Sequence, residues 1–159
     1  MTVDQPTDVS TTAGRFGAPR RSTIARVALY LGAAAVLATG IDHVQQFYAD
    51  DYRDVPTIGT LFYLNFVSAV VVAAGLVVPL RRIAGRYAGT IRAAFAVAGI
   101  GLAALSLVAL FVSESGGLFG FQEDGYRTPI ALAIVFEAAA IVFLVTFLVA
   151  SGRGGSSTP

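Results

Sequence analysis

The sequence of 159 residues contains no cysteine, and only 13% of its residues are charged. Without cysteine the chain has no disulfide bonds, thiolate metal sites or thiol–disulfide chemistry, which excludes the small four-span redox enzymes that use cysteine pairs. Lysine is also absent, so every basic residue is arginine. This bias, with abundant alanine, glycine and valine, is typical of bacterial proteins encoded by GC-rich genomes. A formal net charge of +1 and scattered arginines offer nucleic acid no basic face, and no such partner is expected.

Hydrophobic residues make up 55% of the chain and gather in four long runs. Each run supplies the roughly 20 residues that span the hydrocarbon core of a bilayer at about 1.5 Å per residue. A helix satisfies its own backbone hydrogen bonds in lipid, so we predict an all-α fold, a transmembrane four-helix bundle that has the lipid bilayer as its first partner. The predicted helices cover residues 24–44, 56–80, 91–112 and 129–150.

The polar segments complete the predicted organisation. Residues 1–22 hold few large apolar groups and are predicted to be a disordered cytoplasmic tail. Residues 23–150 form the transmembrane domain, and residues 151–159 are a second cytoplasmic tail. A cleaved secretory signal is the alternative reading of the first run, but the run is longer than the usual signal core of about 7–15 residues.

The arginines lie mainly on one side of the predicted bundle. On that side are Arg15, Arg20, Arg21, Arg26, Arg81, Arg82, Arg86, Arg92 and Arg153. The other side has Arg53 and Arg127 and most of the acidic residues. Cytoplasmic flanks retain arginine during insertion. We therefore predict a multi-pass protein of the cell inner (cytoplasmic) membrane, with both termini and loop 81–90 in the cytoplasm and loops 45–55 and 113–128 outside.

The two predicted outer loops resemble each other. Residues 47–53 and 121–127 share the pattern Phe-x-x-Asp-x-Tyr-Arg, and each is followed by the proline that begins the next predicted helix, Pro56 or Pro129. The match favours a duplicated helical hairpin, with two halves related by a pseudo-twofold axis along the membrane normal. Any site would then lie on that axis, between the halves.

Glu137 is the most informative residue, because it lies about 12 Å inside the fourth predicted helix. A carboxylate there is unfavourable unless it is paired, protonated or facing water. Its neighbours one turn away, Ala133 and Ala140, allow close helix contact, which predicts that Glu137 faces the bundle interior. Asn65 occupies a similar depth in the second helix, and we expect a direct or water-mediated hydrogen bond between Asn65 and a protonated Glu137.

Further polar residues are expected at the same level. The first helix has one face of Gly32, Val36, Thr39, Gly40 and His43. His43, the only histidine, is therefore predicted to point inward. The candidate ligand or proton site comprises Glu137, Asn65, His43, Asp42 and Glu114. The candidate rim of this site comprises Tyr52, Arg53, Tyr63, Tyr126 and Arg127.

This constellation admits three readings. Buried polar groups often only join helices through hydrogen bonds, as structural clamps. An ionisable residue within a membrane also marks ligand or proton sites, here one open to the outside. A metal site at His43 and nearby carboxylates is the third reading, but one histidine without an H-x-x-H spacing does not support zinc. No metal ligand, cofactor or catalytic residue is predicted.

The leading functional hypothesis is a non-enzymatic membrane protein, either an accessory subunit of a larger membrane complex or a homo-oligomer. The first alternative is a proton-coupled transporter or small-ligand binder that uses Glu137. The second is a membrane enzyme acting through Asp42, His43 and Glu114. No nucleophile elbow, phosphate-binding loop or dinucleotide fingerprint occurs in the sequence.

Two stretches carry a resemblance, the sequence HVQQFY at residues 43–48 and PTIGTLFYLN at residues 56–65. They resemble a pattern shared by small bacterial four-span integral membrane proteins that are uncharacterised, so the resemblance implies a fold and no activity. In helix count the chain is also similar to DoxX-like proteins.

Overall fold

The computed structural model describes residues 18–49, 51–55, 57–117 and 128–152. Within these ranges it contains helices and no strand. The long helices are α1 (Ala18–Ala49), α2 (Ile58–Val77), α4 (Ala88–Gly116) and α5 (Thr128–Gly152). The short elements are η1 (Tyr52–Asp54), α3 (Leu80–Ala84) and η2 (Gly85–Tyr87). Four helices are long and apolar enough to cross a membrane, which confirms the predicted all-α bundle and the multi-pass architecture.

Several helix ends differ from the sequence-based expectation. Helix α1 begins at Ala18, so residues 18–22 are helical and not part of a disordered tail. It continues to Ala49, beyond the predicted end at residue 44. The predicted loop 81–90 contains α3 and η2 and the first turn of α4. The tail 1–17, the proline at position 56 and most of the second predicted outer loop lie outside the described residues.

Helix α2 ends earlier than predicted, at Val77, because Pro79 follows closely. The residue before a proline is driven to extended backbone, and Val78 has φ −57° and ψ 145°. Arg92 of α4 donates from Nε to the carbonyl of Leu76 at 3.1 Å and from Nη2 to the carbonyl of Val78 at 2.9 Å. The carbonyl of Val78 also accepts from the backbone N–H of Leu80 at 2.7 Å. The bonds from Arg92 join α2 to α4 at this end of the bundle.

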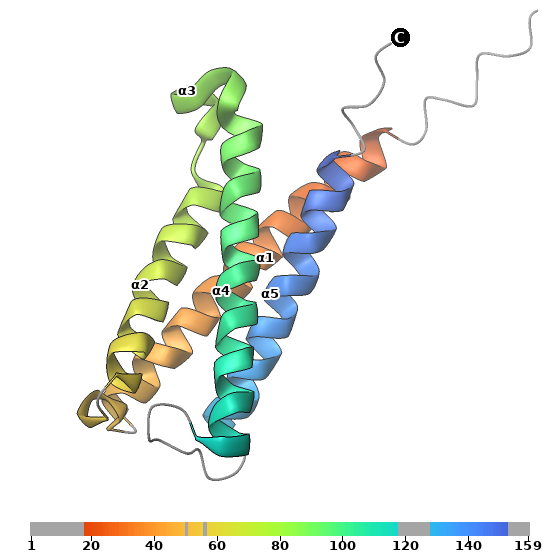
Figure 1. The fold of residues 1–159 in the computed structure, drawn as a ribbon. Coiled ribbons are helices and arrows are strands. Elements are labelled where there is room, and N and C mark those ends of the chain that lie inside the picture. Colours follow the sequence, from red (N-terminus) through yellow and green to blue (C-terminus); the bar gives the residue numbers. More distant parts are fainter. Residues whose placement is uncertain (1–17, 50, 56, 118–127, 153–159) are drawn as a thin grey trace, which may run out of the picture.

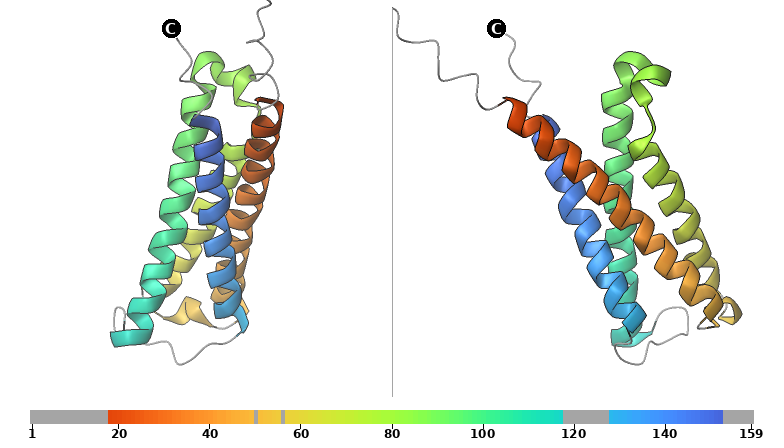
Figure 2. Two further views of the ribbon diagram at one scale, coloured as in Figure 1. Left: turned by 90° about the vertical axis from the view of Figure 1, so that its right-hand side faces the viewer. Right: turned by 180° about the vertical axis from the view of Figure 1, so that it is seen from behind.

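The four long helices form a ring in which α1 contacts α2 and α5, and α4 also contacts α2 and α5. Helices α2 and α5 occupy opposite corners, and their backbones do not approach each other closely. Helix α1 crosses the bundle obliquely behind α2 and α4, as Figure 1 shows. The two views of Figure 2 place α1 beside α5 near the α3 end and near α2 at the η1 end.

We divide the bundle into two halves. The η1 half comprises residues 39–49 of α1, 58–68 of α2, 103–116 of α4 and 128–139 of α5, and the α3 half comprises the remaining residues of these helices. The interior of the α3 half is apolar and closely packed. Leu76 and Leu144 are 0% exposed, and Leu144 packs so closely against Gly32 and Gly99 that a Cβ at either glycine would lie within 2.8 Å of its side chain.

The outer surface of the bundle is apolar along every long helix. Ile83 and Leu105 are each 72% exposed, and Val97, Val135 and Val142 are each 59% exposed. A surface of this kind is favourable in hydrocarbon and not in water. The structure therefore has the polarity of a membrane protein, with apolar side chains facing outward and polar side chains inside.

Candidate functional site

A pocket of about 280 Å³ lies in the η1 half of the bundle, between helices α2 and α5. All four long helices and η1 line it. Its polar lining residues are His43, Gln46, Tyr52, Asn65, Ser68, Ser106, Ser113 and Glu137. Its size is near the lower end of the range for small-molecule sites. The ring of helices leaves this space because the backbones of α2 and α5 lie apart.

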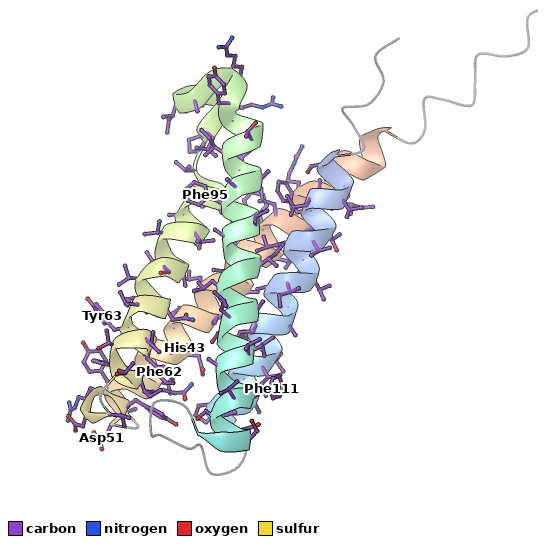
Figure 3. All side chains as sticks on the ribbon, viewed as in Figure 1. His43, Asp51, Phe62, Tyr63, Phe95 and Phe111 are labelled. Carbon is purple, nitrogen blue, oxygen red and sulfur yellow. The ribbon has the colours of Figure 1, made fainter. Side chains whose placement is uncertain are left out.

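The ring of His43 is held on three sides. Its Nδ1 lies 2.9 Å from the carbonyl oxygen of Thr39, and because a carbonyl only accepts, Nδ1 is the donor. In the neutral ring Nε2 then accepts, and the hydroxyl of Ser106 lies 3.1 Å from it. The edge of the ring meets Phe62, with centroids 4.9 Å apart. Figure 3 shows His43 and Phe62 in the space between α2 and α4.

Glu137 faces the same pocket from α5 and is only 1% exposed. Its Oε1 lies 4.0 Å from Nε2 of His43, too far for a hydrogen bond. Ser106 lies beside Glu137 as well, but neither carboxyl oxygen has a hydrogen-bond partner among the described residues. The predicted inward face is confirmed, since Ala133 and Ala140 are buried on the same side of α5. A buried carboxyl group without partners is unfavourable, and such sites call for an explanation.

Asn65 lines the pocket from α2 and is 8% exposed. The direct hydrogen bond that we expected between Asn65 and Glu137 is absent, since Oδ1 of Asn65 and both carboxyl oxygens of Glu137 have no partner in the described chain. The reason is the separation of α2 and α5 across the pocket. His43, on the intervening helix α1, is the side chain that approaches Glu137.

The other two candidate acids lie beside the pocket and do not line it. Asp42 is 6% exposed and accepts a hydrogen bond from Nε2 of Gln46 at 2.6 Å. Glu114 is half-buried in the last turn of α4. The predicted cluster is therefore divided: His43, Asn65 and Glu137 share one pocket, whereas Asp42 and Glu114 are outside its lining.

The candidate rim residues have different positions. Tyr52 is buried and lines the pocket, with its ring stacked on Phe62 at 4.7 Å between centroids. Gly59 allows this close approach of η1 to α2, since a Cβ there would lie 2.5 Å from the carbonyl oxygen of Tyr52. Arg53 is at the surface. Its Nη2 lies 3.5 Å from Oδ1 of Asp51, and its Nε lies 3.7 Å from Oδ2 of Asp54. Tyr63 is 47% exposed, and Tyr126 and Arg127 lie outside the described residues.

Sequence reasoning missed Ser106, whose hydroxyl lies 3.1 Å from Nε2 of His43. Ser106 is the only polar residue between Arg92 and Ser113 of α4, and this isolation within an apolar run was a signal that could have found it. Its contact with His43 could not be predicted, because it depends on how α1 crosses α4.

The pocket has an apolar side between α2 and α4. Leu61 and Leu64 of α2 and Leu105 of α4 line it and are also 41%, 51% and 72% exposed. These leucines connect the pocket with the outer apolar surface of the bundle. A ligand dissolved in the bilayer would therefore meet apolar side chains before the polar groups of His43 and Glu137.

The arrangement is suited to holding a proton or a small polar group. A histidine and a carboxyl group at 4.0 Å can exist as a neutral pair or as an ion pair with the same number of protons. Among the described residues there is no group of three histidine or acidic side chains that could hold a metal ion.

The comparisons with known proteins add no identity to this geometry. The chain matches no protein-family model, no curated protein and no solved structure. The fold and the site together define a class, a multi-pass four-helix membrane protein with a polar pocket in one half of its bundle.

Proposed function

We propose that the protein binds a small ligand within the membrane, in the pocket lined by His43, Asn65 and Glu137. The observation that carries this proposal is the carboxyl group of Glu137, which is 1% exposed, faces a cavity and has no hydrogen-bond partner in the described chain. A bound ligand would supply the missing partner. This function corresponds to the first alternative from the sequence, the small-ligand binder that uses Glu137.

A structural clamp explains Glu137 less well. A clamp between helices requires a hydrogen bond from Glu137 to a neighbouring helix, and none is present among the described residues. A buried carboxyl group without a hydrogen bond lowers stability. Such a residue is accounted for by a function that needs it and not by a contribution to folding.

The pair formed by His43 and Glu137 supports coupling of ligand binding to a proton. Nδ1 of His43 is occupied by the carbonyl of Thr39, so any proton exchanged with Glu137 would pass through Nε2. A ligand that interacts with the ionised carboxylate releases the proton of Glu137, and rebinding of that proton favours release of the ligand. This cycle is the minimum that a proton-coupled transporter requires.

The proposal includes a location in the cell inner membrane, with both termini in the cytoplasm. The distribution of arginine supports this orientation, since Arg81, Arg82 and Arg86 lie exposed at the α3 end of the bundle. The η1 half, with the pocket, would then be the outer half.

Binding can be tested with four six-carbon molecules that differ only in their polar group: hexylamine, 1-hexanol, 2-hexanone and hexanoic acid. We expect at least one of them to raise the thermal unfolding midpoint of the wild-type protein in phosphatidylcholine nanodiscs. Ala109→Phe fills the pocket and should abolish the shift. Ala131→Phe, the same change on an exposed position of α5 outside the pocket lining, is the matched control. No shift with any molecule, or equal shifts in both variants, would contradict the proposed function.

The protonation of Glu137 provides a second test, by infrared difference spectroscopy on the protein in lipid. We expect a carboxylic acid band that is absent from Glu137→Gln and that responds to the pH of the medium, because a functional pocket is connected to water. A band that is unchanged at every pH would leave only a structural role for Glu137.

Self-association is a second candidate, favoured by the exposure of α4. In the most apolar stretch of residues Leu80–Gly116, which include α4, only 17% of the residues are buried. The corresponding share in α1 is 44%. Ala94 and Ala98 are exposed on α4, and a Cβ at Gly101 would meet nothing within 4 Å. Small residues permit close approach of a second helix. Subunit counting by single-molecule photobleaching, with Gly101→Leu as the disrupting variant, should give a dimer that the substitution dissociates, and a monomeric wild type would exclude this candidate.

A further inference from the structure

We propose that the ligand of this pocket is a lipid-soluble amine, which enters from the bilayer between α2 and α4 and places its ammonium group against Glu137. This inference rests on the proposed function and adds the chemical class of the ligand and its route.

The polar groups that lack partners select a hydrogen-bond donor. In the described chain they include Oε1 and Oε2 of Glu137 and Oδ1 of Asn65, and all three belong to residues that line the pocket. These oxygens are acceptors when Glu137 is ionised. An ammonium group supplies three donors and no acceptor, so it complements this set, whereas a carboxylate or a phosphate would add further acceptors.

The charges around the pocket favour a cation. No arginine is among the lining residues. The titratable group that approaches Glu137 is His43 of α1, whose Nε2 lies 4.0 Å from Oε1. Asp42, also of α1, lies outside the pocket lining but close enough to interact electrostatically with Glu137. Helix α2 contributes Asn65 and helix α4 contributes Ser106, neither of which carries a charge. A ligand with one positive charge would neutralise Glu137, and it would form a charge-assisted hydrogen bond with the carboxylate.

The apolar lining specifies the rest of the ligand. Leu102, Leu110 and Ile130 line the pocket together with apolar residues of α2. The exposed Leu61, Leu64 and Leu105 continue this lining to the outer surface between α2 and α4. A hydrophilic amine would gain nothing from these contacts. A hydrocarbon chain attached to the amine is already in an apolar environment in the bilayer. It therefore favours binding only if it packs better in the pocket than among lipid chains, and this requires an apolar group of limited size.

The test compares hexylamine with 1-hexanol, which has the same chain and a neutral polar group, by calorimetric titration in phosphatidylcholine nanodiscs. We expect hexylamine to bind about tenfold or more tightly than 1-hexanol, because charge-assisted hydrogen bonds are about twice as strong as neutral ones. Glu137→Gln should remove this preference and leave weak binding of both molecules. The infrared band of the protonated carboxyl group should decrease when hexylamine is added to the wild-type protein.

The outcomes separate the two proposals. Equal or tighter binding of 1-hexanol or 2-hexanone, lost in Ala109→Phe, would overturn the amine as ligand and leave the binding pocket in place. No binding of any molecule would overturn the proposed function itself. A tenfold preference that persists in Glu137→Gln would also overturn the inference, because the ammonium group would then contact another residue.

The amine can come from a free metabolite or from the headgroup of an aminophospholipid. Repeating the titration in nanodiscs that contain phosphatidylethanolamine distinguishes these sources. Weaker apparent binding of hexylamine would identify the lipid as a competitor, and unchanged binding would identify a free amine. The route is tested with Leu105→Trp, which adds bulk at the exposed side of the pocket and should slow association of hexylamine, while Val108→Trp, on an exposed position of the same helix, should not.

Discussion

The two halves of the bundle differ in the side chains that fill their interiors. In the α3 half the helices meet through apolar side chains and glycines, and Leu76 and Leu144 are completely buried. Every buried polar or charged side chain in the described chain lies in the η1 half, together with the pocket. In lipid, packing is a main source of helix association. The α3 half therefore supplies the stability that allows the η1 half to keep unpaired polar groups.

The strongest way to test this division is to remove packing from the α3 half. Leu144→Ala leaves a cavity beside Gly32 and Gly99, and we expect it to lower the free energy of unfolding by about 3 kcal/mol. Val142→Ala, at a position 59% exposed, is the control and should change it by less than about 0.5 kcal/mol. Unfolding by SDS in mixed micelles measures both. Similar losses in the two variants would show that Leu144 does not join the helices.

A smaller effect on stability is expected from the hydrogen bonds that join α4 to α2 in the α3 half. Arg92→Leu removes two hydrogen bonds to the carbonyls of Leu76 and Val78. We expect a loss of about 2 kcal/mol in the free energy of unfolding, because each carbonyl loses a charged donor. Hydrogen exchange should become faster in the last turn of α2. Arg86→Leu, at an exposed position, serves as the control, and an unchanged exchange rate in α2 would contradict the role of Arg92.

In the η1 half we expect a substitution with the opposite sign. Glu137→Leu removes a buried carboxyl group that has no hydrogen-bond partner in the described chain, and should raise the free energy of unfolding by about 1 kcal/mol. The same change should remove the preference for hexylamine over 1-hexanol. A loss of stability would mean that Glu137 contributes to the fold, and it would weaken the distinction between the two halves.

The smallest effect is expected at Ser113, whose buried hydroxyl group has no hydrogen-bond partner among the described residues. Ser113→Ala should change the free energy of unfolding by less than about 0.5 kcal/mol, since no bond is lost. Thr39→Ala is an informative companion, because Thr39 donates to the carbonyl of Ala35 at 3.2 Å. Unfolding in SDS should distinguish the two, and a large loss at Ser113 would reveal a partner outside the described residues.

The sequence was sufficient for the class of fold and for the direction of the main side chains. An apolar run long enough to span a membrane satisfies its own backbone hydrogen bonds as a helix, so four spanning helices could be predicted. Helical periodicity also placed His43 and Glu137 on inward faces, and both are buried. These conclusions depend only on local geometry, which the order of residues determines.

Relations between helices were not accessible in the same way. The direct hydrogen bond that we expected between Asn65 and Glu137 is absent, because the backbones of α2 and α5 lie apart across the pocket. The contact of Ser106 with His43 depends on where α1 crosses α4. A single sequence does not indicate which residues of two helices lie opposite each other. The early end of α2 at Val77 was accessible in principle, since Pro79 is visible in the sequence.

The attachment of α2 to α4 through Arg92 has a mechanical consequence. Helix α2 has 20 residues and extends about 30 Å from this attachment. With one end fixed, α2 acts as a lever, and a rotation of about 5° displaces its far end by about 2.6 Å. Leu61 lies 15 residues from Leu76, about 22 Å along the helix, so the same rotation would alter its distance from Leu105 by up to about 2 Å, about half the width of a methyl group.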